Sequence, residues 1–196
     1  QTLPRNGEAP TERTEAWVLF DNENFYVSAR CWDSAPPNRW VANEMRRDAN
    51  NLFNNDHFGV SFDGFYDRRN GYGFVVNANG ALLDWSTTNE QPNNSWNGVW
   101  DAAARRTSDG WVAEMAIPMV TLRSPDVPVQ TWGINFARQV RRKNEQVYWS
   151  PIPKPYNIMQ VSLAGTVTGM TELNRGLDLR IKPYVTAGGK YDRSGT

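Results

Sequence analysis

The chain has 196 residues, which is enough for one domain with a short extension. Lys and Arg together number 21, as do Asp and Glu, so the formal net charge is zero and no strong field attracts nucleic acid or anionic lipid. One cysteine and one histidine exclude an intrachain disulfide, a cysteine metal cluster and a His-pair metal site. No apolar run approaches the roughly 18 residues that a membrane helix needs.

Patterns of apolar and polar residues, read in chain order, predict an extended lead-in over residues 1–15 followed by strands. The first two strands cover 16–21 and 24–32. An Asn-rich irregular stretch is expected over 48–56, a surface loop over 89–97, and a short helical turn over 119–123, just after Pro118. The remaining strands are predicted over 39–47, 57–63, 71–77, 100–105, 110–117, 132–140, 146–150 and 160–168.

The clearest signal lies in residues 56–85. Phe58, Val60 and Phe62 alternate with small or polar residues, and a similar alternation resumes after the Asn70-Gly71 pair. Period-two alternation is typical of a strand with one buried face, and Asn-Gly tolerates the backbone angles of a tight reversal. This antiparallel hairpin, with about ten short strands and no long helical period, predicts an all-β antiparallel sandwich over residues 16–169.

The character of the sequence changes in residues 170–196, which we interpret as a linker followed by one more strand. Leu177, Leu179 and Ile181 alternate with Asp178, Arg180 and Lys182. Such a strand fits either the wall of a following membrane barrel or the edge of the same sandwich, and the spacing alone does not choose between them.

Four stretches together resemble the carbohydrate-binding family 9-like domain that precedes an outer-membrane β-barrel of unknown function in Gram-negative bacteria. They are PTERTEAWVLFDNENFYVSARCWDS, RRDANNLFNNDHFGVSFDGFYDRRNGYGFVVNANGA, WNGVWDAAARRTSDGWVAEMAIPMVTLR and WGINFARQVRRKNEQVYWSP, spread over roughly residues 10–165. Residues 172–190 resemble the start of such a barrel. The family usually opens with a strand and a Leu-Asp-Gly-type segment that this sequence lacks.

The resemblance implies a jelly-roll type sandwich in the periplasm or at the outer membrane. It also implies an oligosaccharide or polysaccharide partner and a C-terminal barrel. We therefore predict a non-catalytic glycan-binding module that requires no cofactor and binds no nucleic acid. One alternative is a structural module that docks onto or caps its barrel without binding sugar. Another is a haem-binding electron-transfer module, with His57 and Met45, Met115 or Met159 as axial ligands.

A sugar site needs aromatic faces for the pyranose ring and planar polar groups for its hydroxyls. Trp96 in the polar loop, Trp149 in a proline-rich loop entry and Trp85 at the end of the first hairpin are the candidate platforms, with local packing as the alternative for each. Asn135 and Arg138 lie on a strand, where they are candidates for hydroxyl or carboxylate recognition. The alternative for Asn135 is a solvated side chain. The alternative for Arg138, together with Arg141 and Arg142, is a salt-bridge set with Glu145 and other acids at a solvated strand end.

Calcium prefers oxygen ligands from Asp and Asn in loops, so Asp48, Asn50 and Asp56 form a candidate structural calcium site. Their spacing does not match an EF-hand, and relatives often carry paired aspartates where this chain has Asn55-Asp56. The alternative is a polar loop that uses asparagine in its turns. Acidic residues are plentiful, but the sequence does not pair two of them as glycoside hydrolysis requires, which favours binding over catalysis.

Overall fold

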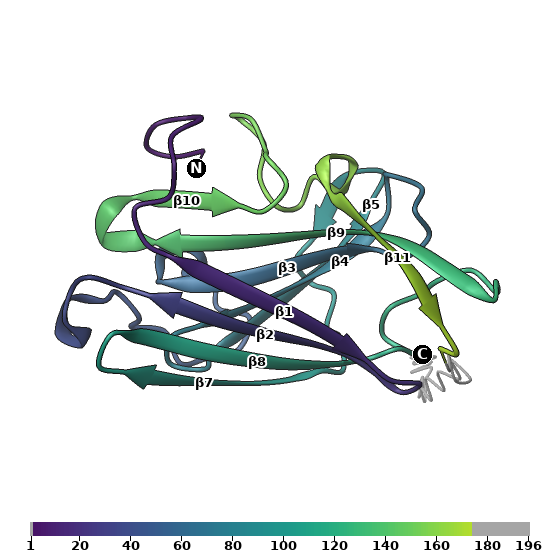
Figure 1. Cartoon of the computed structure of the whole chain (residues 1–196), viewed down its shortest axis with the longest axis horizontal. Helices are drawn as coiled ribbons and strands as arrows, with labels where there is room; N and C mark the ends of the chain where they lie inside the picture. Colours follow the sequence, from purple (N-terminus) through teal and green to yellow (C-terminus); the bar gives the residue numbers. More distant parts are fainter. Residues whose placement is uncertain (1, 174–196) are drawn as a thin grey trace, which may run out of the picture.

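The computed structural model describes residues 2–173, in which eleven strands form two antiparallel sheets packed face to face (Figure 1). The smaller sheet has the order β1-β2-β8-β7, with β1 Thr14–Phe20, β2 Asn24–Trp32, β7 Asp101–Thr107 and β8 Gly110–Pro118. The larger sheet has the order β10-β9-β3-β4-β5-β6, and β11 also pairs with β9. Its strands are β3 His57–Asp63, β4 Gly71–Asn77, β5 Leu82–Thr88, β6 Gln91–Asn93, β9 Val129–Val140, β10 Glu145–Tyr148 and β11 Gly165–Thr171.

The main core fills the space between the two sheets and is built largely from aromatic rings. Phe25 on β2 meets Phe62 on β3 edge-to-face with centroids 5.0 Å apart, and it stacks on Trp132 of β9 at 5.9 Å. Each of these residues lies at an inward position of a strand whose side chains alternate between the two faces. The predicted antiparallel sandwich is therefore confirmed.

A second apolar cluster covers the outer face of the larger sheet. Trp85, Val75 and Leu83 on this face are buried beneath Ile152 and Ile158, which belong to the segment that follows β10. We call this covering segment, residues 150–163, the roof. It explains why every residue of β3 is buried, since the strand is covered on both faces. The outer face of the larger sheet is therefore closed.

Several local predictions were wrong. Residues 39–47 form no strand, because their backbone donors bond to side chains: Asp56 Oδ2 accepts from Val41 N at 2.6 Å, and Asn55 Oδ1 accepts from Asn43 N at 2.7 Å. The predicted loop 89–97 contains the short strand β6. The short turn expected over residues 119–123 is present, with Thr121 N donating to the Pro118 carbonyl oxygen. The last predicted strand, 160–168, begins instead as a 3-10 turn, with β11 starting at Gly165.

The strand expected within residues 177–182 lies outside the described residues. Across residues 2–173 no helix is long and apolar enough to cross a membrane.

Candidate functional site

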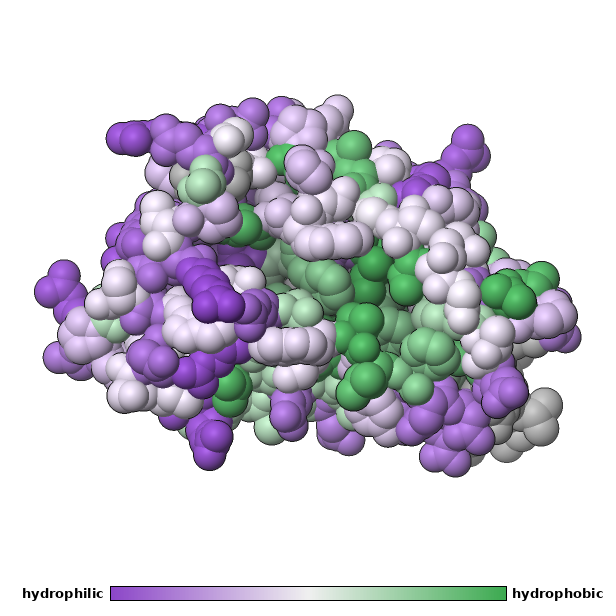
Figure 2. Space-filling model, viewed as in Figure 1, coloured by the Kyte–Doolittle hydropathy of each residue, from purple (hydrophilic) through white to green (hydrophobic). Residues whose placement is uncertain are grey.

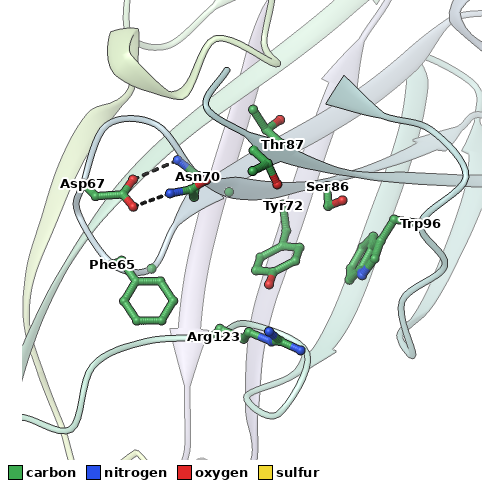
Figure 3. Close-up of a pocket in the computed structure, with 11 residues that line it drawn as sticks. Phe65, Asp67, Asn70, Tyr72, Ser86, Thr87, Trp96 and Arg123 are labelled. Carbon is green, nitrogen blue, oxygen red and sulfur yellow. Dashed lines mark hydrogen bonds between the residues drawn. The ribbon is translucent and has the colours of Figure 1, made fainter. Parts of the chain in front are cut away.

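A hollow of about 510 Å³ opens at one end of the sandwich, where β4 begins and β5 ends (Figure 3). We call it the Trp96 pocket. The loop between β3 and β4 forms one side, the residues after β6 form another, and a turn after β8 contributes Arg123. Its lining consists of Gly64, Phe65, Asp67, Asn70, Gly71, Tyr72, Ser86, Thr87, Thr88, Trp96 and Arg123.

Aromatic rings form one wall of the pocket. The rings of Tyr72 and Trp96 lie with centroids 4.8 Å apart and a 37° angle between their planes. Trp96 is half-buried, and its ring also meets Phe74 edge-to-face at 6.0 Å, so it stands against the main core with part of its surface in the pocket. Phe65, on the far side of Tyr72 in Figure 3, is 49% exposed.

Polar groups stand beside this wall. Asp67 accepts hydrogen bonds from the backbone N–H groups of Arg69 and Asn70, both at 2.8 Å, and from Asn70 Nδ2 at 2.6 Å (Figure 3). Burial acts to raise the pKa of Asp67, but these hydrogen bonds outweigh it and hold the pKa below its ordinary value. The pocket therefore carries a fixed carboxylate that stays ionised in mildly acidic solution.

The buried carboxylate of Asp84 anchors the loop that carries Trp96. Asp84 accepts from Arg47 Nη2 at 2.7 Å, from Trp100 Nε1 at 2.8 Å and from Gly98 N at 3.1 Å. Arg47 donates in turn to Asn97 Oδ1 and to the Gly98 carbonyl oxygen. These bonds fix the two residues that directly follow Trp96.

This arrangement suits binding better than hydrolysis. Glycosidases need two carboxyl groups on either side of the scissile bond. Asp67 is the only carboxylate among the described residues that line the Trp96 pocket. Ring faces, one carboxylate, an amide and several hydroxyls are the groups that hold a sugar by stacking and hydrogen bonding.

Two of the predicted ligand residues are corrected by the structure. Trp85 is fully buried, because it lies directly across the hairpin from Gly73, whose missing side chain leaves room for the indole. Asn135 is also buried: its Nδ2 donates to the Ser150 carbonyl, and its Oδ1 accepts from Ser150 N at 2.8 Å. Asn135 tethers the start of the roof segment instead of facing solvent.

Arg138 and Trp149 lie elsewhere in the molecule. Arg138 is buried and joins the two sheets, donating to the carbonyl oxygens of Arg13 and Trp32 and to Thr14 Oγ1, so the interpretation as a ligand contact is corrected. The predicted salt-bridge set is found at Arg142, which pairs with Glu12 and Asp33, but not at Arg138. Trp149 is 59% exposed beside a small groove between β1 and β9, apart from the Trp96 pocket.

The candidate metal and haem ligands have other partners. The Asp56 carboxylate accepts from the backbone of Val41 and Arg141, and Asp48 Oδ2 lies 3.4 Å from Arg47 Nε. No group of three or more His, Cys, Asp or Glu side chains within residues 2–173 is arranged to hold a metal, and the calcium site with Asn50 remains a prediction. His57 is buried against Phe53, with Nδ1 2.9 Å from the Asn55 carbonyl oxygen.

Sequence reasoning missed most of the Trp96 pocket. Tyr72 falls within the predicted strand 71–77, and Asp67 and Asn70 fall within the polar loop of the predicted hairpin. Phe65 carries no predicted role. One signal was present: an aspartate in such a loop often forms an Asx turn with the backbone two residues on, here Arg69 N, which fixes the carboxylate of Asp67. The pairing of this loop with Trp96, more than twenty residues away, could not be derived from local patterns.

No protein-family model matches the sequence, and no curated protein matches it. Among solved structures, a candidate carbohydrate-binding protein from Bacteroides uniformis superposes with a TM-score of 0.65 at 15% identity, over 80% of this chain and 78% of its own. A carbohydrate binding module of family 9 from Caldicellulosiruptor kristjanssonii, in complex with glucose, superposes with a TM-score of 0.58 at 16% identity. The match covers 90% of this chain and 84% of that module. A family 9 module from the same organism, in complex with cellotriose, superposes with a TM-score of 0.58 at 17% identity. The match covers 93% of this chain and 87% of that module.

At these identities the similarity shows the fold. The chain is a two-sheet antiparallel β-sandwich with the family 9 carbohydrate-binding-module fold, as the sequence resemblance predicted.

Proposed function

We propose that the chain is a non-catalytic carbohydrate-binding module and that its ligand occupies the Trp96 pocket. The observation that carries the proposal is the contact between the Trp96 and Tyr72 rings, 4.8 Å apart, beside the fixed carboxylate of Asp67. The similar fold of modules whose structures contain glucose or cellotriose supports the same ligand class.

The energetics fit a short, neutral oligosaccharide. Burying about 100 Å² of apolar ring surface contributes about 2–3 kcal/mol, and a hydrogen bond to a charged group adds about 1.5–3 kcal/mol. Part of this gain is offset by the cost of immobilising the ligand. The expected dissociation constant is therefore about 0.1 mM or weaker.

The sequence resemblance also leads us to propose that the module works in the periplasm or at the outer membrane, next to a barrel. That part rests on the four family-like stretches and is independent of the pocket geometry.

Calorimetric titration with a panel of neutral and acidic oligosaccharides tests the proposal. We expect saturable binding of at least one glycan, with affinity reduced about tenfold or more in Trp96→Ala, because the stacking face is lost. Trp149→Ala is the matched control, since it removes an exposed indole outside the pocket, and its affinity should not change. No binding across the panel by the folded chain, or equal losses in both variants, would contradict the assignment.

A further inference from the structure

The edge strand β1 carries a run of exposed apolar side chains. It ends the smaller sheet, so one side of its backbone has no partner strand within residues 2–173. Four consecutive side chains on it are exposed: Trp17 51%, Val18 39%, Leu19 71% and Phe20 43%. Native proteins usually protect a sheet edge with charge, proline or a covering segment, because a free apolar edge invites strand pairing. This strand contains a single charged residue, Glu15, and no proline.

Hydrogen bonds of the residues that flank β1 show which of its backbone groups face the free edge. At the start, the Arg13 carbonyl oxygen accepts from Trp32 N, and at the end Asp21 N donates to the Asn24 carbonyl oxygen. Both bonds continue the β1–β2 register, and such bonds alternate along an antiparallel pair, so odd-numbered residues of β1 bond to β2. The N–H and C=O groups of even-numbered residues within 14–20 therefore point toward the free edge.

An apolar groove lies beside this edge, between the two sheets. Thr14 and Ala16 of β1 form one side of it, and Phe58 and Phe136 of the larger sheet line it as well. The groove encloses about 190 Å³. Figure 2, drawn in the same view as Figure 1, shows apolar side chains gathered across the middle of this face, around a hollow in the surface. A strand added to the edge of β1 would cover this groove with the side chains of one of its faces.

We propose that the free edge of β1 binds the β1 strand of a second copy of this chain. The two strands run antiparallel about a two-fold axis that passes beside Trp17, so that one surface patch meets itself, as in most homodimers. All residues of Thr14–Phe20 are then paired, and the two four-stranded sheets join into one continuous sheet. The proposal does not depend on the proposed sugar site.

The backbone and the charges of the strand select this register. The free N–H and C=O groups belong to even-numbered residues, so an even-numbered residue must lie opposite an even-numbered residue of the partner. An axis at Trp17 meets this condition and places Glu15 opposite the partner's Leu19. An axis at Val18 meets it too, but it places Glu15 opposite the partner's Asp21, and like charges directly opposite each other are destabilising.

The side chains of the two copies also complement each other in this register. On the outer face of the joined sheet, Trp17 lies opposite the partner's Trp17. On the inner face, the partner's Phe20 lies opposite Thr14 and the partner's Val18 lies opposite Ala16, and these two residues of β1 line the groove. An axis at Ala16 would place Phe20 beyond the partner's β1 and leave it uncovered. The axis at Trp17 therefore covers the exposed apolar side chains and the groove together.

The covered area is sufficient for a reversible dimer. The exposed parts of the side chains of residues 17–20 amount to roughly 400 Å² in each copy, given the size of such side chains. With the backbone edge and the groove included, two copies would bury about 1,000 Å² in total, which is the lower limit for a specific interface. The chain carries no net charge, so two copies do not repel each other.

Analytical ultracentrifugation of the full chain, from about 1 µM to about 200 µM, measures the oligomeric state. We expect the mass to rise from that of a monomer to that of a dimer across this range. Trp17→Lys should keep the chain monomeric throughout, because two ammonium groups would meet at the axis. Val99→Lys is the matched control: it replaces an apolar residue that is 76% exposed just before β7, at the other edge of the smaller sheet, and it should leave the dimer unchanged.

Cysteine cross-linking at the highest protein concentration tests the register. Trp17→Cys should give a disulfide-linked dimer under mild oxidation, because directly opposite residues in a non-hydrogen-bonded pair have Cα atoms about 4.5 Å apart. Leu19→Cys is the matched control on the same face, since the two copies of residue 19 would lie about 13 Å apart along the strand. It should cross-link at least about tenfold more slowly. Cys31 does not interfere, because burial raises the pKa of its thiol to about 11.

Three results overturn the proposal: a monomer mass at every concentration, a dimer that persists in Trp17→Lys, or equal cross-linking rates for the two cysteine variants. Amide hydrogen exchange of the unmodified chain gives a further measurement that needs no substitution. The amides of Ala16, Val18 and Phe20 should exchange slowly at high protein concentration and rapidly at low concentration. Slow exchange of these amides at every concentration would assign the edge of β1 to a segment of the same chain, against the proposal.

Discussion

Arg47 donates from Nη2 to the fully buried carboxylate of Asp84 at 2.7 Å, and through this pair the core of the larger sheet holds the loop that carries Trp96. The same carboxylate accepts from the indole N–H of Trp100 and from the backbone of Gly98. A single anionic side chain thus joins β5, the strand-free stretch before β3 and the pocket loop. Its removal should affect both the stability of the chain and the position of the Trp96 ring.

Asp84→Ala should lower the free energy of unfolding by about 2–4 kcal/mol, because it leaves the buried N–H groups of Trp100 and Gly98 without an acceptor and removes one of the acceptors of Arg47. Urea unfolding followed by circular dichroism measures the change. Asp101→Ala removes a carboxylate from an exposed position of β7 and should change stability by less than about 0.5 kcal/mol. Similar values for the two variants would show that the Asp84 network contributes little.

Gly73→Ala should destabilise the chain by about 1–3 kcal/mol, because its new methyl group would lie 1.9 Å from the buried Trp85 ring. Gly165→Ala is the informative comparison. Its methyl group would also meet an indole, that of Trp149 at 2.2 Å, but this ring is 59% exposed and can turn away. We expect Gly165→Ala to cost clearly less in the same unfolding experiment. An equal cost would mean that the outer face of the larger sheet is not tightly packed around Trp85.

Stability should fall between pH 6.5 and about pH 4 because of His57. Burial lowers the pKa of this imidazole to about 4, so the unfolded chain takes up a proton in this range that the folded chain does not. The stability that the neutral ring provides is therefore present above pH 6.5 and is lost as the pH falls through about 4. The loss amounts to about 3 kcal/mol at most.

His57→Asn provides the comparison for the His57 prediction, since asparagine keeps a donor near the Asn55 carbonyl but does not titrate. Unfolding free energies of the two proteins at pH 7, 6, 5 and 4 should converge as the pH falls. If the unfolding free energies of the two proteins instead fell in parallel with pH, His57 would be excluded as the cause of the pH dependence.

Sugar affinity should stay constant from pH 7 to pH 5, because hydrogen bonds from Asn70 and Arg69 keep the pKa of Asp67 low. Asp67→Asn should weaken binding about tenfold at every pH in this range, since it replaces a charged acceptor by a neutral one. Calorimetric titrations at three pH values compare the two proteins. A loss of affinity on acidification in the natural chain would point to another titrating group in the site.

The hairpin of β3 and β4 could be predicted because alternation is local evidence and sets the buried face. Its turn was predicted less well, because Gly71 already belongs to β4 and the left-handed backbone of the loop lies at Tyr66 and Arg68. Residues 39–47 show the opposite case. Their alternation imitates a strand, but their backbone donors bond to Asn55 and Asp56, residues too far along the chain for periodicity to detect. An extended backbone without a partner strand has the same sequence pattern as one with a partner.

The candidate site was predicted only in part, because some of its evidence is local and the rest depends on contacts between distant segments. Trp96 was identified from its polar neighbours, whereas its contact with Tyr72 depends on how β4 meets the loop after β6. Trp85 was misassigned because its burial depends on Gly73 across the hairpin, and a glycine opposite a large ring is visible only once the register of β4 and β5 is known.

The roof of residues 150–163 over the larger sheet determines how a polymer can meet this module. If the Trp96 pocket binds sugar as proposed, a polysaccharide has no open outer face of that sheet along which to lie, and contact would be limited to the few sugar units that enter the pocket at the end of the sandwich. Attachment to a long glycan would then depend on how many modules a surface displays, and not on the length of glycan that each module covers. A densely displayed array would hold a polymer firmly while each single contact exchanged rapidly.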